Sequence, residues 1–228
     1  MQASFFYALK RGKHTMTMTP AAKQCLAKLS ALLVREPVET DRVILRPFKR
    51  TDLADLFAYQ VQPEQQRLSG NHELHTIEEA AEVLDFFMDP SHPPYSFAIE
   101  CKAENKVIGN LSIGIHSSIA DEEALRNKRG VSLSYVLNEN YWRQGIMTEI
   151  LRVLYRLLFE KGNLDYINSG YFSFNEGSSR LQHKLGMKPL KEELIEWDGA
   201  QILVKEMVLL REDYCLTNTK STHIIEQM

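Results

Sequence analysis

A strand pattern that leads directly into a helix pattern constrains this chain more than any other feature. The segment VSLSYVL alternates from Val131 to Leu137, and a period of two predicts a strand. After a turn that contains Gly145, apolar residues recur on one helical face: Ile146, Ile150, Leu151, Leu154, Leu157 and Leu158. Gly162 stands where such a helix would stop. The next apolar run, YINSGYFSF, predicts a second strand, so we expect one central strand–helix–strand crossover.

The other patterns predict a mixed α/β fold of the α+β type. We expect a central mixed twisted sheet of about six to seven strands, flanked by helices. The additional strands are predicted from period-two runs at residues 38–48, 96–102 and 106–118, and from a final pair around Asp198-Gly199.

Helix signals occur between these strands. Thr51 and Thr76 are suited to cap two helices, and Glu79 completes a capping box with Thr76. A short helix is predicted from Ser178 to Gly186. The polar segment 61–75 has no clear period, and we interpret it as a loop.

The 228 residues suit one domain with appended ends. We place an N-terminal extension at 1–36, the main domain at 37–212 and a C-terminal tail at 213–228. The first 35 residues carry basic but no acidic residues, which fits either a mitochondrial presequence or a simple extension. Within them, one apolar helical face predicts a short amphipathic helix: Cys25, Leu26, Leu29, Leu32 and Leu33.

Composition excludes several classes of protein. Three distant cysteines without a CxxC pair indicate neither a disulfide framework nor a zinc site, so we expect no metal and a reducing, cytoplasmic setting. A net charge of -3 gives no case for nucleic-acid binding, and no apolar run is long enough to cross a bilayer.

The turn before the long helix has the properties of an anion site. The N–H groups of a helix N-terminus are unpaired and favour negative charge. Gly145 would let a phosphate approach the backbone, and Arg143 adds positive charge. No GxxxxGK[ST] or GxGxxG motif is present. By spacing alone, the glycine is better explained as a turn residue than as part of a phosphate site.

Two segments at a characteristic separation resemble the GNAT N-acetyltransferase superfamily. The first combines Ser134–Leu137 with YWRQGIMTE, Tyr141 to Glu149, and the second is NEGSSRLQHKLGM, Asn175 to Met187. The chain is most similar to the branch that includes the ribosomal-protein N-terminal acetyltransferases. The resemblance covers roughly residues 38–212.

The resemblance implies a GNAT fold with parallel strands that splay apart at an acetyl-CoA site. Acetyl-CoA would be the cosubstrate, and the N–H of Leu137 would stabilise the oxyanion while Ser178 assists thiolate departure. The residues implied to bind the cofactor are Tyr135, Val136, Leu137, Trp142, Arg143, Gln144, Gly145, Ile146, Met147, Thr148, Asn175 and Ser178.

The sequence departs from the family pattern at three positions. Met147 replaces a usual glycine or alanine, Ser132 stands where many members carry glutamate, and Gln182 stands where many carry a catalytic tyrosine. Ser178 is also suited to cap a helix, so its role stays open between catalysis and structure. His116, Glu100 and Glu176 are weak candidates for the base.

The function that follows is acetyl transfer from acetyl-CoA to a primary amine by direct attack on the thioester. The acceptor is a protein N-terminal α-amine or a small-molecule amine, and a homodimer is compatible with the sequence. The alternative is a non-catalytic acyl-CoA-binding module. We expect residues 1–35 to be dispensable for chemistry.

Acceptor choice is expected in three segments: the loop 61–75, the segment after Met88, and the charged excursion 119–130. The polar side chains that could line the acceptor site are Arg67, His72, Glu73 and His75.

Overall fold

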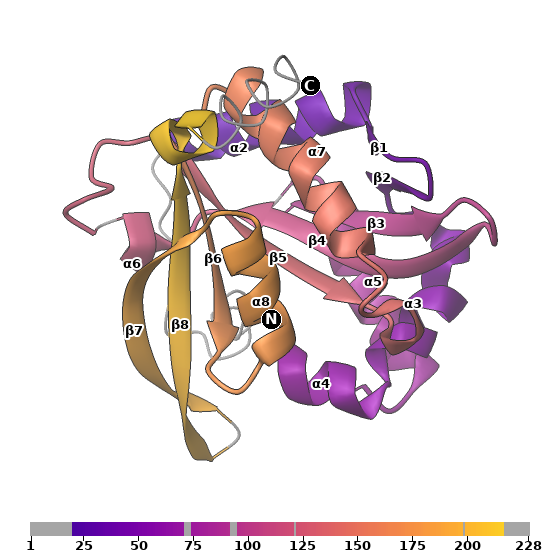
Figure 1. Ribbon diagram of the computed structural model, residues 1–228. Helices are drawn as coiled ribbons and strands as arrows, with labels where there is room; N and C mark the ends of the chain where they lie inside the picture. The colour runs from indigo at the N-terminus through magenta and orange to yellow at the C-terminus, as the bar shows by residue number, and fades with distance from the viewer. Residues whose placement is uncertain (1–19, 71–73, 92–94, 121, 198, 217–228) are drawn as a thin grey trace, which may run out of the picture.

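One mixed sheet of eight strands organises the chain, in the order β1-β2-β3-β4-β5-β6-β8-β7 (Figure 1). This computed structural model describes residues 20–70, 74–91, 95–120, 122–197 and 199–216. The strands are β1 (Val38–Glu39), β2 (Val43–Pro47), β3 (Tyr95–Cys101), β4 (Lys106–Gly114), β5 (Gly130–Leu137), β6 (Tyr166–Phe172), β7 (Lys188–Trp197) and β8 (Ala200–Leu210).

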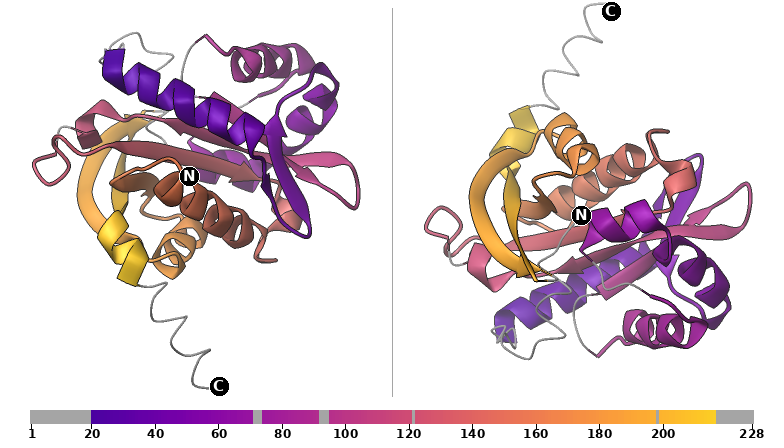
Figure 2. Two further views of the ribbon diagram at one scale, coloured as in Figure 1. Left: turned by 90° about the horizontal axis from the view of Figure 1, so that it is seen from above. Right: turned by 90° about the horizontal axis from the view of Figure 1, so that it is seen from below.

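Helices cover both faces of the sheet (Figure 2). They are α2 (Pro20–Arg35), α3 (Leu53–Gln60), α4 (Pro63–Ser69), α5 (Ile77–Met88), α6 (Ser117–Ala120), α7 (Ile146–Glu160) and α8 (Glu176–Lys184). Successive side chains of β5 point to opposite faces. Tyr135 and Leu137 pack in the main core with α7, whereas Val136 packs with α3 and α5.

The predicted crossover β5–α7–β6 is confirmed, and its two parallel strands separate along their length. β5 and β6 pair only from Gly130–Tyr166 to Ser132–Asn168. Beyond this point β5 still pairs with β4 as far as Leu137, and β6 still pairs with β8 as far as Phe172. The facing edges of β5 and β6 are therefore open, as the family resemblance implied.

The first predicted strand, 38–48, is interrupted. A turn divides it into β1 and β2, which pair antiparallel at the sheet edge. The Thr40 N–H donates to the Val43 carbonyl at 2.9 Å, and the Thr40 hydroxyl accepts the Val43 N–H at 3.1 Å. This split accounts for an eighth strand, and it places Arg42 in the turn.

The prediction that 61–75 is a loop was wrong, because it contains α4. Pro63 occupies the first turn, where a missing N–H costs nothing, and Gly70 ends the helix with a φ of 64°. The inward positions of α4 are Gln65 and Ser69. Since these are polar, no apolar period marks the helix.

Two capping predictions had different outcomes. The Thr76 hydroxyl accepts the Glu79 N–H, and the Glu79 carboxylate accepts the Thr76 N–H, so the predicted capping box is confirmed. Thr51 caps nothing, because it lies inside a 3-10 turn, Arg50–Asp52, and α3 starts only at Leu53.

The amphipathic helix α2 packs into the main core with α7. Leu26, Leu29 and Leu33 are buried there, and Leu29 lies so close to Gly162 that a Cβ on this glycine would collide with it. Thr19, the expected cap, lies outside the described residues. Among the described helices, none has the length and apolarity to cross a membrane.

Candidate active site

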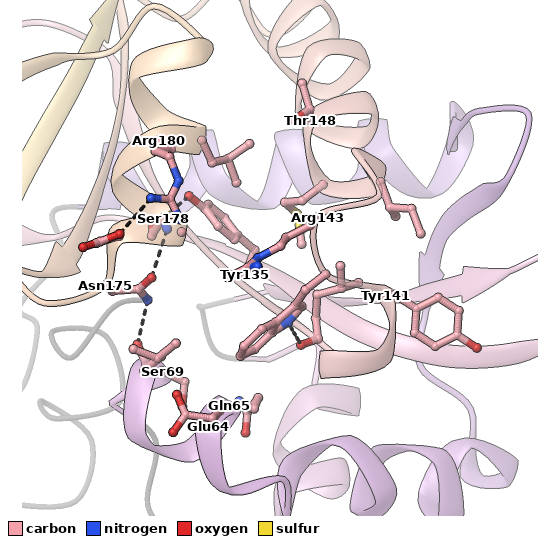
Figure 3. A pocket seen from close by; sticks show the side chains of 18 of the residues that line it. Glu64, Gln65, Ser69, Tyr135, Tyr141, Arg143, Thr148, Asn175, Ser178 and Arg180 are labelled. Carbon is pink, nitrogen blue, oxygen red and sulfur yellow. Dashed lines mark hydrogen bonds and ion pairs between the residues drawn. The ribbon is translucent and has the colours of Figure 1, made fainter.

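A cleft of about 520 Å³ lies at the opening between β5 and β6 (Figure 3). Its walls come from the turn before α7, from α8 along its length and from α4. The predicted site residues that line it are Tyr135, Leu137, Trp142, Arg143, Gly145, Ile146, Met147, Thr148, Asn175 and Ser178. Elements far apart in the chain thus bring most of the predicted site together.

Two of the predicted cofactor residues do not line the cleft with the others. The side chain of Val136 packs against α3 and α5, because alternation in β5 turns it away from the α7 face. The Gln144 side chain donates to the Asn140 carbonyl at 2.8 Å. Only their backbone groups remain candidates for ligand contact.

The turn before α7 presents backbone amides to the cleft. Gly145 is the N-cap residue with a φ of 80°, and no side chain caps this helix end. Arg143 also adopts a positive φ, of 59°, which is uncommon for a residue with a side chain. A Cβ on Gly145 would meet only Arg42, at 3.8 Å. The glycine is thus required by its backbone angle and leaves room for an anion.

Arg42 holds this turn from the β1–β2 hairpin. Its Nη1 donates to the Gln144 carbonyl at 3.0 Å, and its Nε donates to Glu149 Oε2 at 2.9 Å. Thr40 and Arg42 together lower the pKa of Glu149. A carboxylate in the first turn would oppose a bound anion, so its pairing with Arg42 preserves the positive character of this helix end. Sequence reasoning missed Arg42, because nothing local marks this contact.

The peptide groups of β5 alternate between its two edges. The Asn138 N–H donates to the Ile108 carbonyl of β4 at 2.7 Å. Alternation therefore directs the N–H groups of Tyr135 and Leu137 toward the open edge. The Trp142 indole donates to the Leu137 carbonyl at 2.7 Å, which holds the indole against the end of the strand.

Ser178 lies in the first turn of α8 and does not cap the helix. The cap is Asn175, whose Oδ1 accepts the Ser178 N–H at 2.9 Å. Its Nδ2 donates to the Leu68 carbonyl at 3.1 Å and so ties α8 to α4. The helix-capping role that the sequence left open for Ser178 is therefore taken by Asn175. The Ser178 hydroxyl is available for other hydrogen bonds.

The site contains a tyrosine hydroxyl, although Gln182 stands at the position where many family members carry their catalytic tyrosine. The Tyr135 hydroxyl lies 3.3 Å from Ser178 Oγ, and Gln182 Nε2 contacts both, at 3.3 Å and 3.1 Å. Burial raises the pKa of Tyr135, so its hydroxyl stays protonated near neutral pH. The phenol comes from β5, 43 residues before Ser178, which is why no local motif indicated it.

Helix α4 forms the wall opposite α8. Gln65 lines the cleft and is 2% exposed, and neither of its side-chain amide atoms has a hydrogen-bond partner among the described residues. Arg67 lies over the Phe174 ring at 5.5 Å and pairs with Glu64. The incorrect loop assignment concealed Gln65.

The other predicted acceptor residues have different positions. Arg67 lines the cleft, whereas His72 and Glu73 lie outside the described residues. The backbone N–H of His75 donates to Glu79 Oε2 at 2.7 Å, before α5 and away from the cleft lining. In the excursion 119–130, Ile119 and Leu125 pack in a small separate core, so this segment does not line the cleft in its described part.

Three further cations line the cleft, and two of the carboxylates considered as the base are already paired with arginines. Arg143, Arg180 and Lys184 bring positive charge to the cleft. Of the weak base candidates, Glu100 pairs with Arg46 at 2.5 Å, and Glu176 pairs with Arg180 at 2.8 Å. Within the described ranges, no group of three His, Cys, Asp or Glu residues is placed to hold a metal ion.

A mixed sheet opened between two parallel strands, with a helix N-terminus at the opening, defines the class of this protein as an acyltransferase. Residues 42–188 match the acetyltransferase (GNAT) domain family. The chain belongs to this family, whose members use acetyl-CoA.

Known relatives agree with this assignment. An uncharacterized N-acetyltransferase of Bacillus subtilis, YoaA, is 29% identical over 154 residues, covering 66% of this chain and 82% of that protein. A putative ribosomal-protein-serine acetyltransferase from Vibrio cholerae has a similar structure, with a TM-score of 0.62 at 18% identity, covering 78% of this chain and 98% of that one. Spermidine N-acetyltransferase from Vibrio cholerae, in complex with CoA and spermine, gives a TM-score of 0.62 at 16% identity over 77% of this chain and 99% of that one.

Proposed function

We propose that this protein transfers the acetyl group of acetyl-CoA to a primary amine by direct attack on the thioester. The observation that carries the proposal is the opening between β5 and β6. It connects the capless helix end at Gly145 with the Ser178 hydroxyl inside one cleft. An extended ligand that is anionic at one end and reactive at the other fits this arrangement.

In this proposal, groups along the cleft bind the cofactor. Its pyrophosphate binds the amides of Gly145 to Thr148, with Arg143, Arg180 and Lys184 as cationic neighbours. The pantetheine arm pairs with the open edge of β5 as an added strand would. The Leu137 N–H then faces the thioester carbonyl and stabilises the oxyanion.

Ser178 donates the proton to the departing thiolate, and the Tyr135 phenol supports it. The 3.3 Å approach of the two hydroxyls supports this arrangement, since the phenol can return a proton to the serine. Proximity supplies the remaining acceleration, because amine and thioester are held together without a covalent enzyme intermediate.

The acceptor is a protein N-terminal α-amine or a small-molecule amine, and it enters from the α4 side. Structural relatives bear the names of both kinds of enzyme. Gln65 is suited to hold a polar acceptor, because its buried amide has unused donor and acceptor atoms in the part of the protein described.

A non-catalytic acyl-CoA-binding module is the second candidate. It is favoured by Ser132, which stands where many family members carry a glutamate base, and whose hydroxyl is bound to Asn168 at 2.8 Å. A hydroxyl in this position cannot accept the ammonium proton unaided.

Thiol release from acetyl-CoA distinguishes the two candidates. The protein is mixed with acetyl-CoA and either spermidine or a short peptide with a free N-terminal alanine. Amine-dependent release of thiol and an acetylated product are expected. Tight CoA binding without turnover on any amine of a wider panel would favour the binding module.

A further inference from the structure

A row of buried polar side chains crosses three strands on the sheet face opposite α7. Ser132 of β5 is in register with Asn168 of β6, and Gly170 of β6 is in register with Glu206 of β8. Ser132, Asn168 and Glu206 are each at most 3% exposed. They lie on the same face as Val136, which is the face that α3 and α5 cover.

The row contains hydrogen-bonding atoms that the protein leaves unused. Ser132 Oγ donates to Asn168 Oδ1 at 2.8 Å and accepts the His116 N–H at 3.0 Å. Asn168 Nδ2 and Glu206 Oε2, by contrast, form no hydrogen bond of good geometry within the described ranges, although the two side chains are near enough for Asn168 to lower the pKa of Glu206. Buried polar atoms are nearly always paired. An unused carboxylate oxygen in the interior therefore points to a donor that arrives with a ligand.

The position of the row connects it with the reaction. Ser132 and Asn168 form the last pair before β5 and β6 part, and Gly170 borders the opening. A Cβ on Gly170 would lie 2.6 Å from Glu206 Oε1, so the carboxyl occupies the space that a side chain would fill. On the other face, the Gly170 carbonyl lies 3.5 Å from Gln182 Nε2, which contacts the Ser178 hydroxyl. Glu206 and Gln182 thus both contact Gly170, and Gln182 connects this residue with Ser178.

We propose that Glu206 is the base that takes the proton from the acceptor ammonium. This inference rests on the proposed acetyl transfer. The carboxylate accepts one ammonium proton, and the freed nitrogen lone pair forms the C–N bond to the thioester carbon. The C–S bond then breaks, and the thiolate takes the proton of the Ser178 hydroxyl. The second proton, which the nitrogen loses as it becomes an amide, restores the hydroxyl of Ser178. Glu206 afterwards releases its proton to solvent.

The electrostatic surroundings suit this role. Burial raises the pKa of Glu206 to about 7, against the lowering effects of Lys191 and of Asn168, while Glu193 acts in the raising direction. Lys191 itself is shared with Glu122 at 3.0 Å and with Glu193 at 3.7 Å. A base whose pKa lies near the working pH combines adequate ionisation with adequate strength.

Other buried carboxylates are already paired. Asp52 is held by Arg46 at 2.7 Å, and the same guanidinium binds Glu100. Glu206 differs in having an oxygen without a partner in the described part of the chain. It lies on the same sheet face as Ser132, where the usual base is missing, and supplies a carboxylate from β8, with β6 between the two strands.

The test is Glu206→Gln, which keeps the shape of the side chain and removes its basicity. kcat/KM is measured with spermidine and with the alanine peptide from about pH 6 to about pH 10, next to CoA affinity. We expect a loss of about 100-fold or more near neutral pH and unchanged CoA affinity. The loss should shrink as pH rises and the amine deprotonates by itself. It should shrink earlier for the peptide, whose α-amine has a pKa of about 7.7–8.0.

Glu192→Gln is the matched control, because it removes an exposed carboxylate of β7 that pairs with Lys205 and does not affect the pKa of Glu206. It should leave the profile close to that of the wild type. Glu206→Asp keeps the carboxylate but shortens the side chain by one methylene. This variant provides the test if Glu206→Gln does not fold. It should lose most of the rate near neutral pH with its melting temperature retained.

Three outcomes would overturn the inference. Full activity of folded Glu206→Gln near neutral pH removes the residue from the reaction. A loss of equal size at every pH assigns Glu206 a structural role only. If the wild type itself acetylates no amine, the proposed function fails first, and the same assay shows this before any variant is compared.

Discussion

Arg42 and Glu149 lie 107 residues apart in the chain, yet the guanidinium Nη2 and the carboxylate Oε2 are 2.5 Å apart. The pair joins the β1–β2 hairpin to the first turn of α7. Because Arg42 also binds the Gln144 carbonyl, it both neutralises the acid near the proposed phosphate site and fixes the turn that carries the amides. The edge hairpin is therefore part of the cofactor site, although it does not line the cleft.

Removal of this link should weaken CoA binding. Arg42→Ala loses a partly exposed ion pair and a charged hydrogen bond, so we expect the Kd for CoA to rise about tenfold. Pantetheine, which lacks the phosphates, should bind unchanged. In a Glu149→Gln background the effect of Arg42→Ala should be smaller, because no carboxylate is left to oppose the phosphates. Calorimetry on the four proteins measures this, with Arg50→Ala as a control for loss of an exposed arginine.

Gly145 offers a test of charge alone. Both Gly145→Asn and Gly145→Asp must adopt the φ of 80°, which these two residues tolerate better than most. Only the aspartate brings negative charge to the phosphate position, so its CoA affinity should be lower than that of the asparagine variant by about tenfold or more. The difference should narrow as salt is added. Equal affinities for the two variants would place the phosphates elsewhere.

Ser178→Ala should lower kcat about ten- to a thousandfold, because the thiolate then leaves without its proton donor. CoA affinity should stay within a few fold. Tyr135→Phe should show a smaller loss of the same kind, since it removes the hydroxyl behind the serine. Rapid-mixing kinetics measures both, and full kcat in Ser178→Ala would leave water as the donor.

Asn175→Ala separates catalysis from helix capping. Asn175 caps α8 and also binds α4, so its removal should cost about 1 kcal/mol or more of stability. Ser178→Ala should melt close to the wild type, because the serine is not the cap. Thermal unfolding of the two variants in parallel checks this assignment, and the opposite order of melting temperatures would contradict it.

The N-terminal helix should matter for stability more than for chemistry. Leu29 is buried against the main core and Gly162, so Leu29→Ala should cost about 2–5 kcal/mol. None of the described side chains of α2 lines the cleft, so KM for acetyl-CoA should be unchanged at a temperature where the variant is folded. A chain that starts at Arg35 loses all four buried leucines of α2 and should melt much lower. Equal melting temperatures would show that α2 is not part of the core in solution.

Local sequence patterns predicted much of the fold and the part of the proposed site that lies in the turn before α7 and in α8. The alternation of β5, the stripe of α7 and the glycine between them predicted the crossover, and the capping box at Thr76 predicted the start of α5. Short motifs also brought the turn 142–148 and Ser178 into one proposed site. In each case the deciding interactions join residues a few positions apart, and periodicity and capping report on such neighbours.

Tertiary structure alone decided the rest. α4 was missed because its buried positions are polar, and the single strand predicted at 38–48 was divided by a turn whose hydrogen bonds leave no apolar signal. The contacts of Arg42 with Glu149, of Tyr135 with Ser178, and of Gly170 with Glu206 depend on strand register. Register is set by the packing of the whole sheet. The alternation within a strand predicts which face of the sheet a residue occupies. Its partner on the neighbouring strand is determined only when distant segments pair.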